Sequence, residues 1–288
     1  GRTMGKFSKA LEKSSRATGR AARPPAASKG VRLEEVKHQS AKSIDPETGR
    51  VSSSFSSAGW DERLKLSTDP YSRYFENFRR LRASILYPKP GSRPRTILVT
   101  SVAPGEGKGF ICANMGVALS QDVEHHALML DCDLRRPTLA KLFGISNDTG
   151  LVDYLQDGVD LSYLIRKTGQ PKLSLIPSGK PPRNPSELLS SQRMAALIQE
   201  LADRYPDRLI LVDSPPNTVA SETNILAQHI DGVVLVIRHG VSKKEHVRKL
   251  VDSVGPDKIA GLVYNGYPQN AFGELLDKKM GYAYNYYY

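Results

Sequence analysis

A phosphate-binding loop is indicated by the sequence SVAPGEGK, which runs from Ser101 to Lys108. Its glycines allow backbone N–H groups to close around phosphate oxygens, and the lysine supplies a positive charge for the outer phosphates. A β-branched run precedes the loop and a helical pattern follows it, which is the context that such a loop requires. The residues expected to bind the nucleotide here are Pro104, Gly105, Glu106, Gly107, Lys108, Gly109 and Phe110.

Two residues of this loop depart from the usual pattern. Val102 replaces the first glycine, which is acceptable where the backbone does not need a positive φ. Gly109 is the more serious departure, because a Ser or Thr hydroxyl normally follows the lysine and coordinates Mg²⁺. Since glycine offers no ligand, either water fills this position or metal binding is weakened.

Three aspartates are candidates for the chemistry at the phosphates. Asp131 and Asp133 follow one apolar run, and Asp213 ends another. Ligands of parallel sheets collect at the ends of strands, so one of the first pair could hold a metal while the other takes a hydroxyl proton. A purely structural role, through capping or ion pairing with Arg135 or Arg136, remains the alternative. Asp213 is in the position of a carboxylate that reaches Mg²⁺ through water.

The elements that must position these residues alternate along the chain. Apolar runs predict strands over 96–101, 127–131, 173–176, 209–213, 232–237 and 259–264. Helical spacing predicts helices over 71–87, 108–120, 186–203, 223–228 and 243–254. Strands that are apolar throughout indicate an α/β fold, in which helices cover both faces of a mostly parallel sheet.

Composition divides the chain into three parts. Residues 1–65 form a basic leader with few large apolar side chains, and residues 1–60 hold 12 Lys and Arg against 5 Asp and Glu within a net charge of +11. Such a leader cannot bury enough surface to order, although it could touch anionic lipid. Residues 66–270 carry the globular pattern, and a flexible tail follows over 271–288. The tail contains five clustered tyrosines, Tyr282, Tyr284, Tyr286, Tyr287 and Tyr288.

Several classes of protein are disfavoured by composition. Two cysteines, Cys112 and Cys132, lack the spacing of a disulfide framework or a zinc site, which favours a cytoplasmic location. No apolar run approaches the roughly 18 to 20 residues that cross a bilayer. A direct role on nucleic acid would rest on the basic leader alone, so no specific nucleic acid is expected.

Together these motifs resemble the bacterial tyrosine kinases of capsule and exopolysaccharide synthesis, P-loop ATPases related to the partitioning ATPases. The likeness runs from about residue 71 to 288. Residues 104–108 are similar to the family's Walker A loop, 131–137 to its second acidic motif, and 213–216 to the end of its Walker B strand. The sequence from Glu76 to Arg82 fits the family's E-x-x-R-x-x-R helix.

The resemblance implies a mechanism with ATP and Mg²⁺ as cofactors. Lys108 and the metal would neutralise the γ-phosphate, and Asp131 would approach the acceptor phenol. Asp133 and Asp213 would organise the metal. In the wider P-loop group, an Asn in the position of Asn265 reads the adenine edge.

The resemblance also implies partners. Glu76, Arg79 and Arg82 share one helical face and would dock on the next subunit of a ring, where that subunit phosphorylates the tyrosine tail. A transmembrane chain-length regulator and a tyrosine phosphatase are the expected partners. The chain resembles the members whose regulator is a separate protein, acting at the inner face of the plasma membrane.

Two other functions stay open at this stage. A degenerate kinase, motivated by Gly109, would bind nucleotide and assemble as a ring scaffold but transfer poorly. A partitioning-type ATPase would share the fold, but such proteins usually carry a second lysine early in the loop, where this chain has Ala103 and Pro104. The tyrosine tail is also left unexplained by that function.

Overall fold

The computed structural model describes residues 42–44, 51–53, 56–65, 68–88, 93–217 and 222–267. Two short strands, β1 (Lys42–Ile44) and β2 (Val51–Ser53), pair with each other antiparallel. The expected flexible tail and most of the expected leader lie outside the described residues. Within them, no helix has the length and apolar composition needed to span a membrane.

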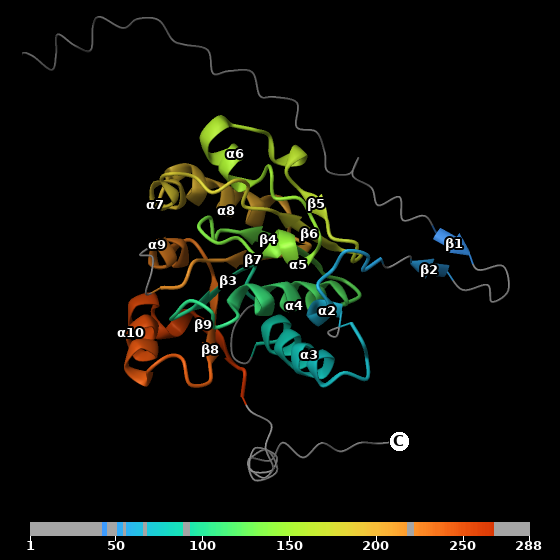
Figure 1. Cartoon of the computed structure of the whole chain (residues 1–288), viewed down its shortest axis with the longest axis horizontal. Helices are drawn as coiled ribbons and strands as arrows, with labels where there is room; N and C mark the ends of the chain where they lie inside the picture. Colours follow the sequence, from blue (N-terminus) through green and yellow to red (C-terminus); the bar gives the residue numbers. More distant parts are fainter. Residues whose placement is uncertain are drawn as a thin grey trace, which may run out of the picture. The chain divides into compact units, whose positions relative to one another are not determined.

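A seven-stranded sheet forms the centre of the fold (Figure 1). Its strands lie in the order β5-β6-β4-β7-β3-β8-β9, and every neighbouring pair is parallel except β5 with β6. The predicted α/β class is confirmed, and the antiparallel edge strand β5 is an addition to it. The strands are β3 (Thr96–Ser101), β4 (His126–Asp131), β5 (Arg166–Lys167), β6 (Leu173–Ile176), β7 (Arg208–Asp213), β8 (Gly232–Arg238) and β9 (Ile259–Asn265).

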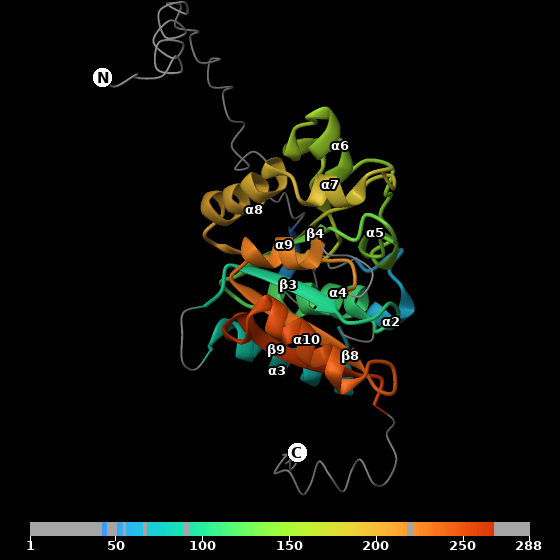
Figure 2. The ribbon, with the colours of Figure 1, turned by 90° about the vertical axis from the view of Figure 1, so that its left-hand side faces the viewer.

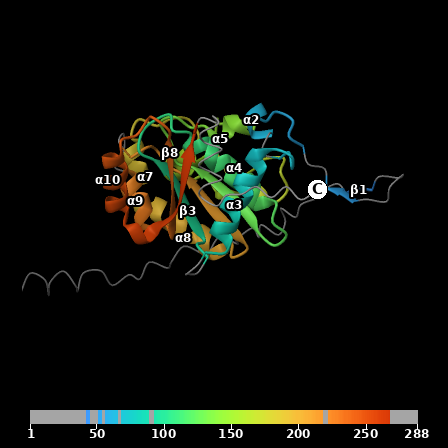
Figure 3. The same ribbon diagram turned by 90° about the horizontal axis from the view of Figure 1, so that it is seen from below.

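Helices cover both faces of this sheet. Along β3, Ile97 and Val99 point to the face covered by α3 and α4, whereas Leu98 points to the other face. Figure 3 shows these two layers, and Figure 2 looks onto the side of α8, α9 and α10. The helices are α2 (Glu62–Lys65), α3 (Arg73–Leu86), α4 (Lys108–Ser120), α5 (Leu139–Leu142), α6 (Leu151–Asp157), α7 (Pro185–Leu189), α8 (Gln192–Arg204), α9 (Glu222–Gln228) and α10 (Lys244–Val254), with short 3-10 turns η2 (Leu161–Tyr163) and η3 (Pro256–Lys258).

The single helix predicted over 186–203 was wrong, because the chain forms two helices there. α7 ends before Ser190, and Ser191 adopts an extended conformation with φ of −72° and ψ of 150°. The Ser191 Oγ accepts a hydrogen bond from Met194 N at 3.2 Å, which caps the start of α8. The apolar periodicity continues through this break, and for that reason it did not reveal the capping serine.

Trp60 and Leu64, which composition places in the leader, are core residues. Trp60 is 4% exposed, and its ring meets Phe143 edge to face at 4.9 Å between centroids. Its Nε1 donates to Thr168 O at 2.7 Å. Residues 60–65 therefore belong to the packed domain, since they bury apolar surface against α4 and α5.

Replacing Trp60 with alanine is expected to lower the free energy of unfolding by about 3 to 5 kcal/mol, through the cavity left in the core and the loss of one buried hydrogen bond. Urea unfolding followed by circular dichroism measures this change. Tyr71→Ala is the matched control, because the Tyr71 side chain is 97% exposed. Equal stability of the two variants would show that the segment around Trp60 does not pack on the domain in solution.

Candidate functional site

The phosphate-binding loop joins the end of β3 to the start of α4. Gly105 and Gly107 adopt left-handed conformations, with φ of 79° and 92°. A β-carbon at Gly107 would also overlap the Asn265 Nδ2, so only glycine fits at this position. The loop thus has the backbone form that phosphate binding by N–H groups requires.

Glu106 is fully buried beneath the loop rather than facing a ligand. Its carboxylate accepts hydrogen bonds from Ala103 N at 2.8 Å and from Arg238 N at 3.2 Å, which ties the loop to the end of β8. The Asn265 Nδ2 donates to Glu106 O at 2.8 Å. Both side chains therefore hold the loop in shape, and the adenine contact expected of Asn265 stays a prediction.

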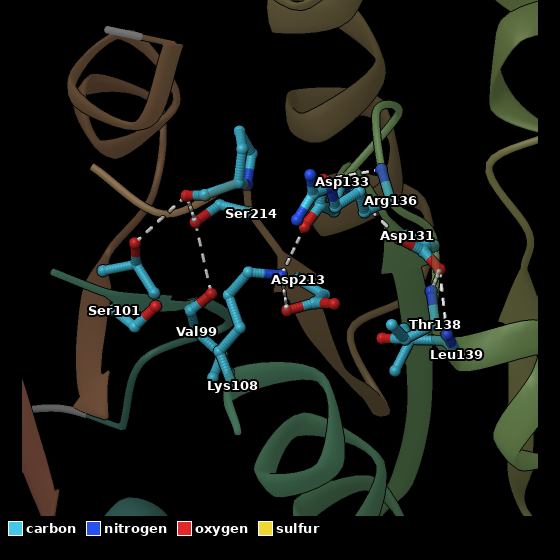
Figure 4. Close-up of polar contacts among 12 residues, drawn as sticks. Val99, Ser101, Lys108, Asp131, Asp133, Arg136, Thr138, Leu139, Asp213 and Ser214 are labelled. Atoms are coloured by element: carbon cyan, nitrogen blue, oxygen red, sulfur yellow. Dashed lines mark hydrogen bonds and ion pairs between the residues drawn. The ribbon is translucent and has the colours of Figure 1, made fainter. Parts of the chain in front are cut away.

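The three predicted aspartates lie at the carboxyl ends of two adjacent strands. Asp131 on β4 pairs in register with Asp213 on β7, and Asp133 follows just beyond β4. The Lys108 Nζ lies 2.6 Å from Asp133 Oδ2 and 3.5 Å from Asp213 Oδ1 (Figure 4). The structure thus brings the loop lysine and these aspartates into one buried cluster.

Asp131 accepts hydrogen bonds from its own neighbouring backbone. Its Oδ1 accepts from Asp133 N at 3.2 Å, and its Oδ2 accepts from Thr138 N at 3.2 Å and Leu139 N at 3.0 Å. The capping role that was left open is therefore present for Asp131. Arg135 pairs instead with Glu222, at 3.0 Å.

The charges in this cluster are strongly perturbed. Burial, together with the charge of Asp213, raises the pKa of Asp131 to about 8. Burial also raises the pKa of Asp213 to about 6 despite the attraction of Lys108. Burial alone would lower the Lys108 pKa, but the charges of Asp213 and Asp133 outweigh it, so the net pKa is raised and the ammonium stays charged.

A divalent cation fits the residues around Asp213. Among the described residues, neither Asp213 oxygen has a hydrogen-bond partner, although both are buried. The ion pair of Oδ1 with Lys108 at 3.5 Å leaves the carboxylate free to bind a cation, and a buried carboxylate is costly unless something binds it. The described residues contain no group of three or more His, Cys, Asp or Glu side chains placed to hold a metal by themselves. Mg²⁺ suits such a site, because it commonly takes one or two carboxylates and completes its shell with waters and phosphates.

A cavity of about 700 Å³ opens beside the loop. Lys108 and Asp133 line it, whereas Asp131 and Asp213 are absent from its wall. Four cationic side chains also line it: Arg63, Arg135, Arg136 and Lys141. The sequence pointed to Arg135 and Arg136 only as ion-pair partners of the aspartates, and to Arg63 and Lys141 not at all. Arg63 comes from the segment assigned to the leader, and its guanidinium lies 5.7 Å from the centre of the Phe110 ring.

The helix expected to mediate docking is α3. Glu76 pairs with Arg79 at 3.5 Å within the helix. Arg82 instead donates to Ala118 O at 3.0 Å, near the end of α4, where a cation meets the unpaired carbonyls of a helix C-terminus. A role of these three residues between subunits stays a prediction.

The two cysteines and the tail tyrosines are the remaining residues that the sequence pointed to. Cys112 and Cys132 are fully buried free thiols, and burial raises the pKa of each well above its usual range. The tail tyrosines lie outside the described residues, so their expected role as phosphate acceptors also stays a prediction.

Comparison with known proteins gives relatives over most of the chain. No protein-family model matches it. Tyrosine-protein kinase YwqD of Bacillus subtilis is 32% identical over 201 residues, covering 69% of this chain and 84% of the relative. The crystal structure of the chimerical protein CapA2B2 is 30% identical with a TM-score of 0.66, covering 73% of this chain and 92% of that one.

The kinase domain of the Escherichia coli tyrosine kinase ETK is 27% identical with a TM-score of 0.65, covering 78% of this chain and 84% of that one. A more distant likeness, to the septum site-determining protein MinD of Pyrococcus horikoshii complexed with Mg-ADP, has 22% identity and a TM-score of 0.53. It covers 64% of this chain and 76% of that one, and it shows the fold alone.

Proposed function

The chain belongs to the bacterial tyrosine kinases, and from this membership we propose that it is an ATP-dependent tyrosine autokinase that regulates capsule or exopolysaccharide synthesis. The observation that carries the proposal is the buried cluster of Lys108, Asp133 and Asp213 beside the loop. A positively charged lysine and two carboxylates at the end of a phosphate-binding loop are the parts that phosphoryl transfer requires.

Each side chain has a proposed task. Lys108 keeps its positive charge. When a nucleotide binds, the Lys108 ammonium would leave Asp133 and bind the outer phosphates. Magnesium, when bound with ATP, would neutralise phosphate charge, and Asp213 supplies a carboxylate toward it. The resemblance gives the acceptor hydroxyl to Asp131. We assign it instead to Asp133, which lines the cavity, because the oxygens of Asp131 accept backbone hydrogen bonds.

The proposed partners follow from the family. Subunits would assemble in a ring through Glu76, Arg79 and Arg82, and each would phosphorylate the tail of its neighbour. A transmembrane chain-length regulator would hold the kinase at the inner face of the plasma membrane, and a tyrosine phosphatase would reverse the modification. The four cationic side chains of the cavity wall suit the negatively charged phosphates of a nucleotide.

The test is the intact mass of the full chain after incubation with Mg-ATP, with and without the membrane partner. Addition of one or more phosphates is expected, and their loss when the five tail tyrosines are replaced by phenylalanine. Tyr71→Phe is the matched control, because this exposed tyrosine lies outside the tail. An unchanged mass in the presence of the partner would contradict kinase activity, and phosphates that remain without tail tyrosines would contradict the tail as acceptor.

A further inference from the structure

The space that the missing side chain of residue 109 would occupy is filled by another residue. A β-carbon built on Gly109 would overlap the Thr138 Oγ1 and would lie 3.3 Å from the Thr138 Cβ. The same β-carbon would lie 3.1 Å from Asp213 Oδ2. A hydroxyl group from a distant part of the chain is thus present at the point where the loop lacks one.

The backbone holds Thr138 in this position without using its hydroxyl. Thr138 precedes α5, but its side chain makes no capping hydrogen bond to that helix. Its N–H donates to Asp131 Oδ2 at 3.2 Å, as does the following N–H of Leu139 at 3.0 Å. The buried Asp131 carboxylate therefore positions Thr138, and the hydroxyl is left available at the cavity wall.

The carboxylate beside Thr138 is that of Asp213. Asp213 is fully buried, and neither of its oxygens has a hydrogen-bond partner among the described residues. In Figure 4 its carboxylate lies between the Lys108 and Thr138 side chains. A hydroxyl oxygen and a carboxylate beside a phosphate-binding loop are ligands of the kind that Mg²⁺ takes together with phosphates and water.

We propose that the Thr138 hydroxyl replaces the loop hydroxyl that Gly109 lacks, and serves as a ligand for the magnesium ion of the bound nucleotide. The inference rests on the proposed function, since it concerns the same nucleotide. The presence of threonine at 138 then compensates for the absence of a hydroxyl at Gly109. Gly109 ceases to indicate a degenerate site, because the missing group is supplied from the segment after β4.

The test is the affinity of the full chain for a fluorescent ADP analogue, titrated with Mg²⁺ and separately with EDTA. Thr138→Val removes the hydroxyl but keeps the shape of the side chain, and Thr138→Ser keeps the hydroxyl. In the valine variant, the increase in ADP affinity that Mg²⁺ causes is expected to be smaller than in the wild type by about tenfold or more. The affinity in EDTA is expected to be unchanged. The serine variant is expected to retain the increase that Mg²⁺ causes.

A swap of the two positions gives an independent measurement. In Gly109→Ser combined with Thr138→Ala, the Oγ1 that would overlap the serine β-carbon is gone, and the serine brings a hydroxyl to the usual place in the loop. The double variant is expected to recover the Mg²⁺-dependent increase in ADP affinity that Thr138→Ala loses. Gly109→Ser alone is expected to gain nothing over the wild type, because the new side chain competes with Thr138 for one position.

The outcomes separate this inference from the proposed function. Mg²⁺ tightening that is absent from the wild type, or that persists in Thr138→Val, would overturn the inference while leaving nucleotide binding intact. Equal losses in the valine and serine variants would overturn it as well, since the hydroxyl would then not be the active group. A wild type that binds no nucleotide in either condition would contradict the proposed function itself.

Discussion

Replacing Lys108 with alanine is expected to reduce autophosphorylation by at least about 10²-fold, the usual cost of removing one well-placed charge or donor from a transition state. The Lys108 ammonium is held in place at the loop, and its raised pKa keeps it charged at neutral pH. Transfer of radiolabelled phosphate from ATP measures the loss. Lys249→Ala, an exposed lysine on α10, is the matched control.

The same substitution is expected to destabilise the fold. Without Lys108, the carboxylates of Asp133 and Asp213 remain buried with no cation between them, and breaking a buried pair in this way costs about 3 to 5 kcal/mol. Lys108→Arg keeps a cation there and separates folding from chemistry. If Lys108→Arg folds like the wild type and also transfers phosphate at the wild-type rate, a specific role for the lysine is contradicted.

Replacing Asp213 with asparagine is expected to have opposite effects on stability and on ligand binding. Asparagine resembles the protonated carboxyl, so it removes a buried charge that has no hydrogen-bond partner among the described residues. Lys108 gives up its longer ion pair, at 3.5 Å, and keeps the one with Asp133 at 2.6 Å. Because burial raises the Asp213 pKa from 3.8 to about 6, the variant should be more stable than the wild type at pH 8. It should also lose the Mg²⁺ tightening of ADP binding.

The pH dependence gives this prediction its sign. A folded pKa above the unfolded one means that the folded state binds more protons between about pH 4 and 6, so the wild-type free energy of unfolding falls as the pH rises through that window. The advantage of the variant should therefore grow between those values and stay constant above them. Urea unfolding at several pH values measures it, with Asp252→Asn on the surface as control. An advantage independent of pH would mean that the Asp213 charge is not its cause.

The fold could be predicted where residue types leave little choice. α4 begins at Lys108 and ends at Ser120 as expected, because the glycine loop fixes its start. The central strands were also predicted, since uninterrupted apolar runs indicate strands that are buried on both faces. Short elements such as α5 and β5 were missed, because four or two residues carry no measurable period.

The sequence pointed to the residues of the cluster but not to the different contacts that each of them makes. The motif predicts both Asp131 and Asp133, yet only the folded chain turns the first onto backbone N–H groups and the second into the cavity. Thr138 gave no signal in the sequence, because its relation to Gly109 spans 29 positions and depends on β4 lying beside β7. The boundary near Trp60 was missed because two core residues are diluted in a polar segment.

The burial of both cysteines has a practical consequence for labelling. Cys112 and Cys132 are the two cysteines of the chain, and each is inaccessible and held as a poorly reactive thiol. Maleimide reagents should therefore pass over the native protein. A single cysteine introduced at Tyr74, an exposed position on α3, would then be the one reactive thiol, and crosslinking or spin labelling through it would test whether subunits meet along this helix as the proposed ring requires.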